Sequence, residues 1–83
     1  MVYTVEFRPA ALKELSRLSP EIAQRIVDKI GLLKIDLAGD VKRLKNFTPR
    51  FRLRVGDWRV LFEVSGDLVQ IWHVSHRRDV YDR

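Results

Sequence analysis

The chain has 83 residues, with 16 Lys and Arg against 11 Asp and Glu, and it contains no Cys. This length excludes a second domain, so we expect residues 1–83 to form a single domain with a small core. The lack of Cys excludes disulfides, thiolate metal ligands and a Cys nucleophile. No apolar run approaches the roughly 18 residues of a membrane span. We therefore expect a cytoplasmic protein with no membrane partner.

The first half of the chain predicts one strand followed by two helices. Residues 2–7 are mostly β-branched or aromatic and predict a strand. Pro9 suits the first turn of a helix, and Ser19-Pro20-Glu21 has the N-cap residue, proline and acid that start a second one. The second helix is expected to run for about 18 residues and to stop at Gly39. Its buried face would comprise Ile22, Ile26, Ile30, Leu33 and Leu37.

The second half predicts a loop and then three strands. Residues 38–50 are basic and irregular, and we expect them to form a loop. Strands are expected at residues 51–55, 58–64 and 68–74, with a polar and basic tail from residue 75. The two-residue connection Gly56-Asp57 suggests a type II′ hairpin turn. The expected fold is α+β, with an N-terminal strand and two helices packed on one face of a mainly antiparallel four-stranded sheet.

The positive charge is concentrated in one part of the chain. Residues 1–41 carry six basic and six acidic side chains, whereas residues 42–83 carry ten basic and five acidic ones. Such a concentrated field attracts nucleic acid or an acidic protein, although a solvated surface is the alternative. Within residues 42–59 one acid, Asp57, accompanies seven cations: Lys42, Arg43, Lys45, Arg50, Arg52, Arg54 and Arg59.

The hairpin turn predicts where four of these arginines point. Its register places apolar residues beneath the helices and projects Arg50, Arg52, Arg54 and Arg59 from the opposite face. Arg54 would then lie opposite Arg59, a like-charge pair that destabilises a sheet. Such local conflicts are expected at functional sites. The alternative is that Glu63, Asp57 or a carboxylate of the tail neutralises these cations.

The side chains available for chemistry are few. Arginine binds phosphate oxygens bidentately and can stabilise the charge of a pentacovalent phosphorane. Phe47 and Tyr81 are candidates for stacking on unpaired bases. His76 heads the basic tail, while His73 lies in an apolar strand and is expected to be structural. Tyr81 is either an ordinary packed tyrosine or a phenolate favoured by neighbouring arginines. No spacing suits a metal site or a phosphate loop, so we expect no metal and no cofactor.

Three segments of the sequence resemble the RelE/ParE toxin superfamily. They are Leu44-Lys45 in the basic loop, the run from Arg52 to Phe62, and the ending His76-Arg77-Arg78-Asp79-Val80-Tyr81. The resemblance covers essentially the whole chain and implies a RelE-like toxin of a type II toxin–antitoxin system. RelE-like members are ribosome-dependent endoribonucleases that cut mRNA in the A site. ParE-like members poison DNA gyrase and lack the nuclease side chains.

The resemblance implies a metal-independent attack of the RNA 2′-hydroxyl on the adjacent phosphate. Tyr81 would be the base, Arg52 and Arg59 would stabilise the phosphorane, and Arg77 would assist the leaving oxygen, with His76 as a reserve acid. The tail arginine of the family falls on either Arg77 or Arg78. Because the family often has Lys at positions 50 and 52, Arg there suits phosphate binding but not a base. Residues expected to bind RNA phosphates are Lys42, Lys45, Arg50, Arg54 and Arg78.

The resemblance also implies partners. We expect the ribosome, mRNA, and a small antitoxin, acidic overall, that lays an amphipathic helix on the basic sheet and forms a toxin–antitoxin hetero-oligomer. Two alternatives remain open from the sequence. One is a gyrase poison, and the other is a non-catalytic basic module that binds nucleic acid or antitoxin with a strong salt dependence.

Overall fold

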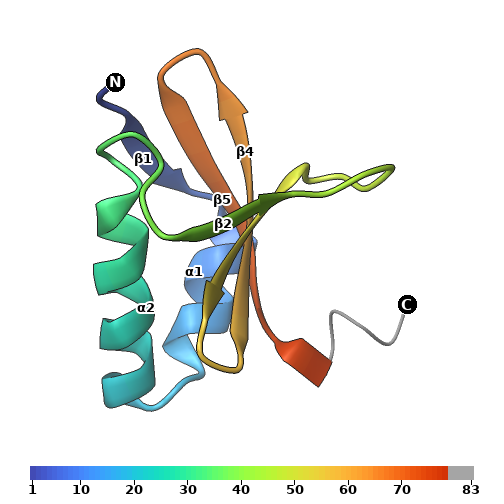
Figure 1. The fold of residues 1–83 in the computed structure, drawn as a ribbon. Coiled ribbons are helices and arrows are strands. Elements are labelled where there is room, and N and C mark those ends of the chain that lie inside the picture. Colours follow the sequence, from blue (N-terminus) through green and yellow to red (C-terminus); the bar gives the residue numbers. More distant parts are fainter. Residues whose placement is uncertain (79–83) are drawn as a thin grey trace.

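A single five-stranded sheet organises the molecule (Figure 1). The structure is a computed structural model, and it describes residues 1–78. Neighbouring strands are antiparallel except β1 and β5, which are parallel, in the spatial order β1-β5-β4-β3-β2. The α+β prediction is therefore confirmed. The elements are β1 (Thr4–Phe7), α1 (Pro9–Ser16), α2 (Pro20–Leu32), β2 (Asp40–Arg43), β3 (Phe51–Val55), β4 (Trp58–Ser65) and β5 (Leu68–His76).

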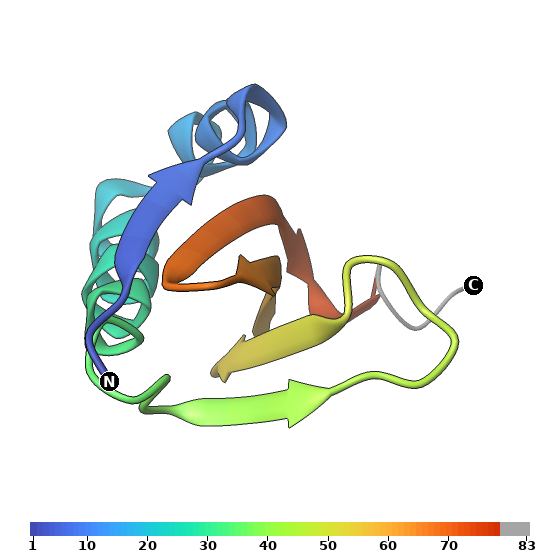
Figure 2. The same ribbon diagram turned by 90° about the horizontal axis from the view of Figure 1, so that it is seen from above.

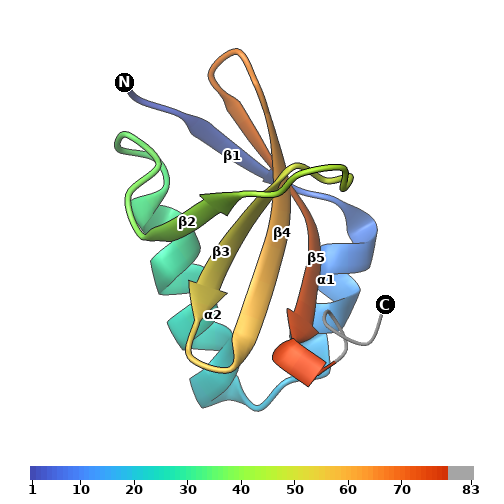
Figure 3. The ribbon, with the colours of Figure 1, turned by 45° about the vertical axis from the view of Figure 1, so that its right-hand side comes forward.

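Both helices pack on one face of the sheet, where they close the hydrophobic core (Figure 2). Ala11 and Leu15 of α1 and Ile26 and Ile30 of α2 are buried against apolar residues of the strands. Phe62 of β4 is fully buried within this cluster. Neither α1 nor α2 lies over the opposite face of β2, β3 and β4 (Figure 3). The two helices therefore do not cover the polar and charged side chains on that face.

The prediction of a loop over residues 38–50 is wrong at its start, where β2 forms. β2 pairs with β3 and makes the sheet five-stranded rather than four-stranded. Its sequence is Asp-Val-Lys-Arg, and only Val41 is partly buried. Short, charged strands are typical of sheet edges, where charge discourages pairing with other chains. Such a strand lacks the apolar alternation by which strands are predicted.

Helix α2 is shorter than its apolar spacing predicts. It ends at Leu32, and the chain then turns, with Asp36 and Leu37 at φ values of 57° and 55°. The apolar pattern continues beyond the helix because Leu33 stays buried in the turn. Ser19 occupies the predicted N-cap position but makes no side-chain capping bond. Among the helices of residues 1–78, none is long and apolar enough to cross a membrane.

The β3–β4 hairpin has the predicted register. Phe51 pairs with Phe62, Leu53 with Val60, and Arg54 with Arg59. Gly56 has a φ of +59°, the positive value expected at the first position of the turn. The β4–β5 pairing is less regular, because the register shifts at Leu61 and Phe62. This shift leaves Trp72 as an extra residue in β5, a β-bulge.

Candidate nucleic-acid interface

The uncovered face of the sheet gathers basic side chains from three strands. Lys42 lies opposite Arg52, Asp40 opposite Arg54, and Arg54 opposite Arg59. Because β2 was not predicted, the sequence anticipates only one of the two like-charge pairs, Arg54 with Arg59. We call this surface the basic face and define it as Asp40, Lys42, Arg52, Arg54, Arg59, Leu61, His73 and Ser75.

Two arginines of the basic face are nearly buried rather than projecting into solvent. Arg52 is 7% exposed and Arg59 4% exposed. Nη1 of Arg52 is buried and has no hydrogen-bond acceptor among residues 1–78. Nη1 of Arg59 donates to the carbonyl oxygens of Gly56 and Trp58, each at 3.1 Å. Both side chains therefore lie on the predicted face but are nearly buried there, and the turn holds the guanidinium of Arg59 in place.

Asp40 is the carboxylate that opposes this charge, and the sequence did not suggest it. Its oxygens lie 3.8 Å from Nη1 of Arg52 and 3.7 Å from Nε of Arg54. Both contacts are longer than a good charge-assisted hydrogen bond. The carboxylate is itself 57% exposed, so water weakens its attraction. Asp40 thus faces two arginines at once, Arg52 and Arg54.

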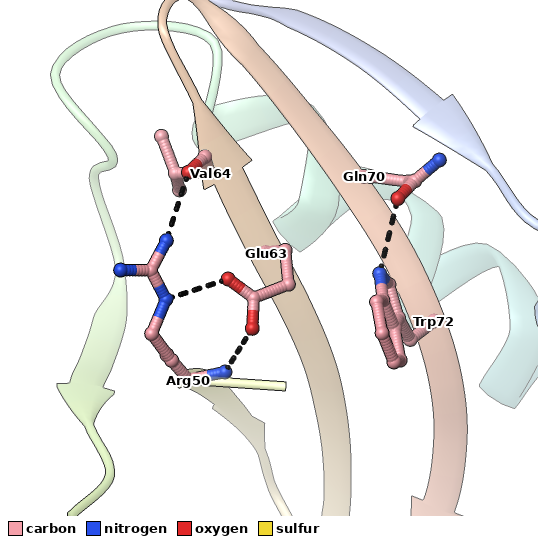
Figure 4. Close-up of polar contacts among 5 residues, drawn as sticks. All are labelled: Arg50, Glu63, Val64, Gln70 and Trp72. Carbon is pink, nitrogen blue, oxygen red and sulfur yellow. Dashed lines mark hydrogen bonds and ion pairs between the residues drawn. The ribbon is translucent and has the colours of Figure 1, made fainter. Parts of the chain in front are cut away.

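Arg50 is neutralised, as the alternative interpretation allowed for any single arginine (Figure 4). Its Nε and its backbone N–H donate to the two carboxylate oxygens of Glu63 at 2.8 and 2.7 Å. Its Nη2 also donates to the carbonyl of Val64 at 3.3 Å. These contacts anchor the start of β3 to β4. Arg50 is therefore paired with Glu63 and is not grouped with Arg52 and Arg59.

The start of the tail lies beside the β3–β4 turn. The backbone N–H of Arg77 donates to the carbonyl of Asp57 at 2.7 Å, and its Nη1 lies 3.8 Å from an Asp57 carboxylate oxygen. Asp57 and Gly56, whose carbonyl binds Arg59, form the same turn. His76 meets Trp58 edge-on, with ring centroids 5.2 Å apart.

Two further residues of the predicted site belong to the tail, Arg78 and Tyr81. Arg78 is exposed, and its backbone N–H donates to Nδ1 of His76 at 3.3 Å. Tyr81, the predicted base, lies outside the described residues, so its position relative to Arg59 stays a prediction.

The loop between β2 and β3 carries the other predicted phosphate-binding residue. Lys45 is exposed and lines an open hollow of about 610 Å³ together with Arg43 and Arg50. Phe47, the predicted stacking residue, is partly buried on the same loop. In Figure 2 this loop extends from the sheet on the side away from α2. Lys45 is thus placed to extend the positive surface beyond the sheet.

A second hollow, which we call the side cleft, borders the basic face. It has a volume of about 260 Å³ and lies between the Phe47 loop, β4, β5 and α1. The sequence predicts a structural role for His73, yet its side chain is 46% exposed and lines this cleft. The alternation of inward and outward residues along a strand does not predict which face His73 lies on, because the bulge at Trp72 interrupts that alternation. The cleft is lined by Glu14, Phe47, Thr48, Pro49, Leu61, Trp72, His73 and Ser75.

Within residues 1–78, no group of three or more His, Asp or Glu side chains is arranged to hold a metal ion. The cations of the basic face can bind an anion. Imidazole, hydroxyl and carboxylate groups lie nearby in the side cleft.

Comparison with known proteins identifies the family. The family model for the ParE toxin of the type II toxin–antitoxin system parDE matches residues 5–81. The chain belongs to the ParE toxin family. The resemblance to the RelE/ParE superfamily inferred from the sequence is thus confirmed, and the chain is a toxin of a type II toxin–antitoxin system.

Three relatives illustrate the similarity. Toxin RelG of Mycobacterium tuberculosis is 32% identical over 87 residues and is matched along the full length of both chains. Toxin RelE3 of Methanocaldococcus jannaschii is 40% identical over 47 residues, which covers 57% of this chain and 53% of that toxin. Among solved structures, a RelB–RelE antitoxin–toxin complex from Methanococcus jannaschii has a TM-score of 0.75 at 30% identity, covering 92% of this chain and 94% of the other.

Proposed function

We propose that this toxin is a ribosome-dependent endoribonuclease that cleaves mRNA in the A site and thereby inhibits translation. The observation that carries the proposal is the state of Arg52. Its guanidinium is nearly buried, Nη1 has no hydrogen-bond acceptor among residues 1–78, and its carboxylate neighbour Asp40 is shared with Arg54. A buried cation without full compensation destabilises a folded protein. An incoming phosphate would supply the missing acceptors.

In the reaction we propose, the RNA supplies the nucleophile, and the protein must chiefly bind and stabilise negative charge on the phosphate. The RNA 2′-oxygen bonds to the adjacent phosphorus and loses its proton, while the bond to the 5′-oxygen breaks and that oxygen gains a proton. The products are a 2′,3′-cyclic phosphate and a 5′-hydroxyl. Between them lies a phosphorane with extra negative charge, and pre-positioned cations are an effective way to stabilise it. The nearly buried guanidinium groups of Arg52 and Arg59 fit this requirement, and the carbonyl of Gly56 holds that of Arg59 in place.

The other roles follow from the sequence resemblance and from position. Arg77 would assist the leaving 5′-oxygen, which is supported by its backbone contact with the turn that also binds Arg59. Tyr81 would be the base, and His76 a reserve acid. The RNA backbone would be held chiefly by Lys42, Lys45, Arg54 and Arg78. Arg50 would contribute through its charge only if the RNA competes with Glu63.

An antitoxin is the partner that the relatives support. Solved structures similar to this chain include a RelB–RelE antitoxin–toxin complex and the RelBE2 toxin–antitoxin complex of M. tuberculosis. We propose that the cognate antitoxin is acidic overall and covers the basic face with an amphipathic helix, which would block RNA. The ribosome and mRNA would be the partners of the released toxin.

DNA gyrase is the second candidate target. It is favoured by the description of the matching family, which names the ParE toxin. This candidate predicts inhibition of supercoiling without mRNA cleavage. It gives no reason for a nearly buried, incompletely compensated arginine on the uncovered face of the sheet.

Primer extension on an mRNA in a translating extract tests the proposal. We expect the wild-type toxin to cut at codon positions only when ribosomes are present, and an Arg59→Ala, Tyr81→Phe double variant to leave the mRNA intact. Lys29→Ala is the matched control, because Lys29 is an exposed cation in the last turn of α2, outside the basic face. It should cut like the wild type. A folded wild-type protein that leaves mRNA intact and inhibits supercoiling would assign the toxin to gyrase.

A further inference from the structure

The side cleft has the size and the lining of a site for one flat ring system. Its volume of about 260 Å³ lies just below the roughly 300–1,000 Å³ of pockets that hold drug-sized ligands. Two aromatic side chains line it, Phe47 from the β2–β3 loop and Trp72 from β5. Leu61, which is 6% exposed, adds an apolar surface from β4.

The β-bulge in β5 brings two neighbouring residues of this strand, Trp72 and His73, into the lining of the cleft. In regular alternation Trp72 and His73 would face opposite sides of the sheet, but both line the cleft because the register shifts between them and β4. The indole of Trp72 is held in place by two contacts. Its Nε1 donates to Oε1 of Gln70 at 3.1 Å (Figure 4), and the guanidinium of Arg8 lies 4.2 Å from its ring centroid. The indole is therefore pre-positioned.

Polar groups converge on the same space. Oε1 of Glu14 accepts the backbone N–H of Val74 at 2.8 Å and lies 3.4 Å from Nδ1 of His73. These contacts place the Glu14 carboxylate and the His73 imidazole side by side in the cleft. Ser75 adds a hydroxyl group, which can donate or accept a hydrogen bond. Aromatic walls with a few polar groups are the usual means of binding an unpaired base.

The cleft also borders the groups that would hold phosphate. Ser75 lies directly opposite Arg59 in the sheet, and His73 lies opposite Leu61, two residues along β4 from Arg59. On the other side, Phe47 and Thr48 are shared with the basic hollow that Arg43 and Lys45 line. A single strand with one phosphate on the basic face could thus place a neighbouring base in the cleft.

We infer that the side cleft is a specificity site that binds one unpaired nucleobase of the RNA beside the cleaved phosphate, and that it prefers purines. The preference follows from the two aromatic walls, since a purine has the larger ring system to stack on them. This inference rests on the proposed nuclease function. It assigns the choice of cleaved codons to Phe47, Trp72 and His73, and the cleavage itself to the arginines Arg52 and Arg59.

Mapping of 5′-hydroxyl ends across many codons in a translating extract tests the inference. The wild-type toxin should favour a purine at one fixed position relative to the cut. Phe47→Ala should reduce that preference about tenfold, the size expected for losing a base–aromatic stack. Phe47→Tyr keeps the ring and should restore it. Lys45→Ala, a change of a neighbouring cation, should lower cleavage at all codons alike and preserve the preference.

The outcomes separate the inference from the function on which it rests. Circular dichroism checks that the Phe47→Ala variant is folded. Cleavage by the folded variant with an unchanged base preference would overturn the specificity site and leave the nuclease intact. A wild-type preference for pyrimidines at every position near the cut would also overturn it. If the wild-type toxin cuts no mRNA, both the inference and the nuclease function are wrong.

Discussion

At the scale of single residues, Arg52 shows a conflict between stability and function. Its guanidinium is nearly buried, yet the contact with Asp40 is 3.8 Å long and Nη1 lacks an acceptor among the described residues. Replacing a buried charged group by an apolar one of similar volume is often neutral or stabilising. Keeping the charge therefore favours a function that needs a cation there.

The substitution Arg52→Met tests this conflict. We expect the free energy of unfolding to stay within about 1 kcal/mol of the wild-type value or to rise, because Met fills the space without needing hydrogen bonds. Cleavage of mRNA should fall by about 100-fold or more, as for loss of one group that stabilises charge in a transition state. Urea unfolding and a cleavage assay measure the two effects. A marked loss of stability with cleavage retained would make Arg52 a structural residue.

At the scale of elements, α1 holds the part of β5 that carries the candidate site. β1 pairs with β5 only from Leu68 to Ile71, so among the described residues no strand lies beside this edge of β5 beyond Ile71. Glu14 of α1 replaces the missing strand by accepting the Val74 N–H at 2.8 Å. Hydrogen bonds to a charged acceptor are stronger than neutral ones. Glu14 is thus a positioning residue for His73 and Ser75.

Variants of Glu14 should show this support directly. Glu14→Ala is expected to lower the free energy of unfolding by about 1.5–3 kcal/mol, the range for a hydrogen bond to a charged group. Glu14→Gln keeps an acceptor and should lose less. Hydrogen exchange should accelerate at the Val74 amide while the Phe62 amide in the core stays protected. Unchanged exchange at Val74 in the alanine variant would show that the bond does not hold β5.

The elements differ in how well their sequences predict them. The β3–β4 hairpin is predicted with its register, because a two-residue turn leaves no freedom in pairing and the apolar residues alternate. β2 is missed because an exposed edge strand needs no apolar pattern. The predicted α2 is too long because Leu33 stays buried after the helix has ended, so the apolar pattern continues past the helix. Local sequence patterns thus predict elements that bury an apolar face in the core. They do not predict an element such as β2, which forms because it pairs with a neighbouring strand.

At the scale of the whole molecule, the residues that stabilise the fold and those of the candidate site lie mainly on opposite faces of the sheet. Both helices and the core occupy one face of the sheet, and the other face is left to cations from β2, β3 and β4. Sequence alone predicts which hairpin arginines lie on that face. It does not predict that Arg59 is buried or that a cleft lies beside it, because both depend on distant segments packing together. The side cleft joins residues as far apart as Glu14 and Ser75.

The most direct test of the central claim is a single-atom change in the substrate. An mRNA with 2′-deoxyribose at one mapped cleavage site is incubated with the toxin and translating ribosomes, beside the unmodified mRNA. Our account predicts that cleavage at the modified nucleotide disappears while other sites are still cut, because the attacking 2′-hydroxyl is absent. Undiminished cleavage at the deoxy position would contradict the account, since the nucleophile would then be something other than the RNA itself.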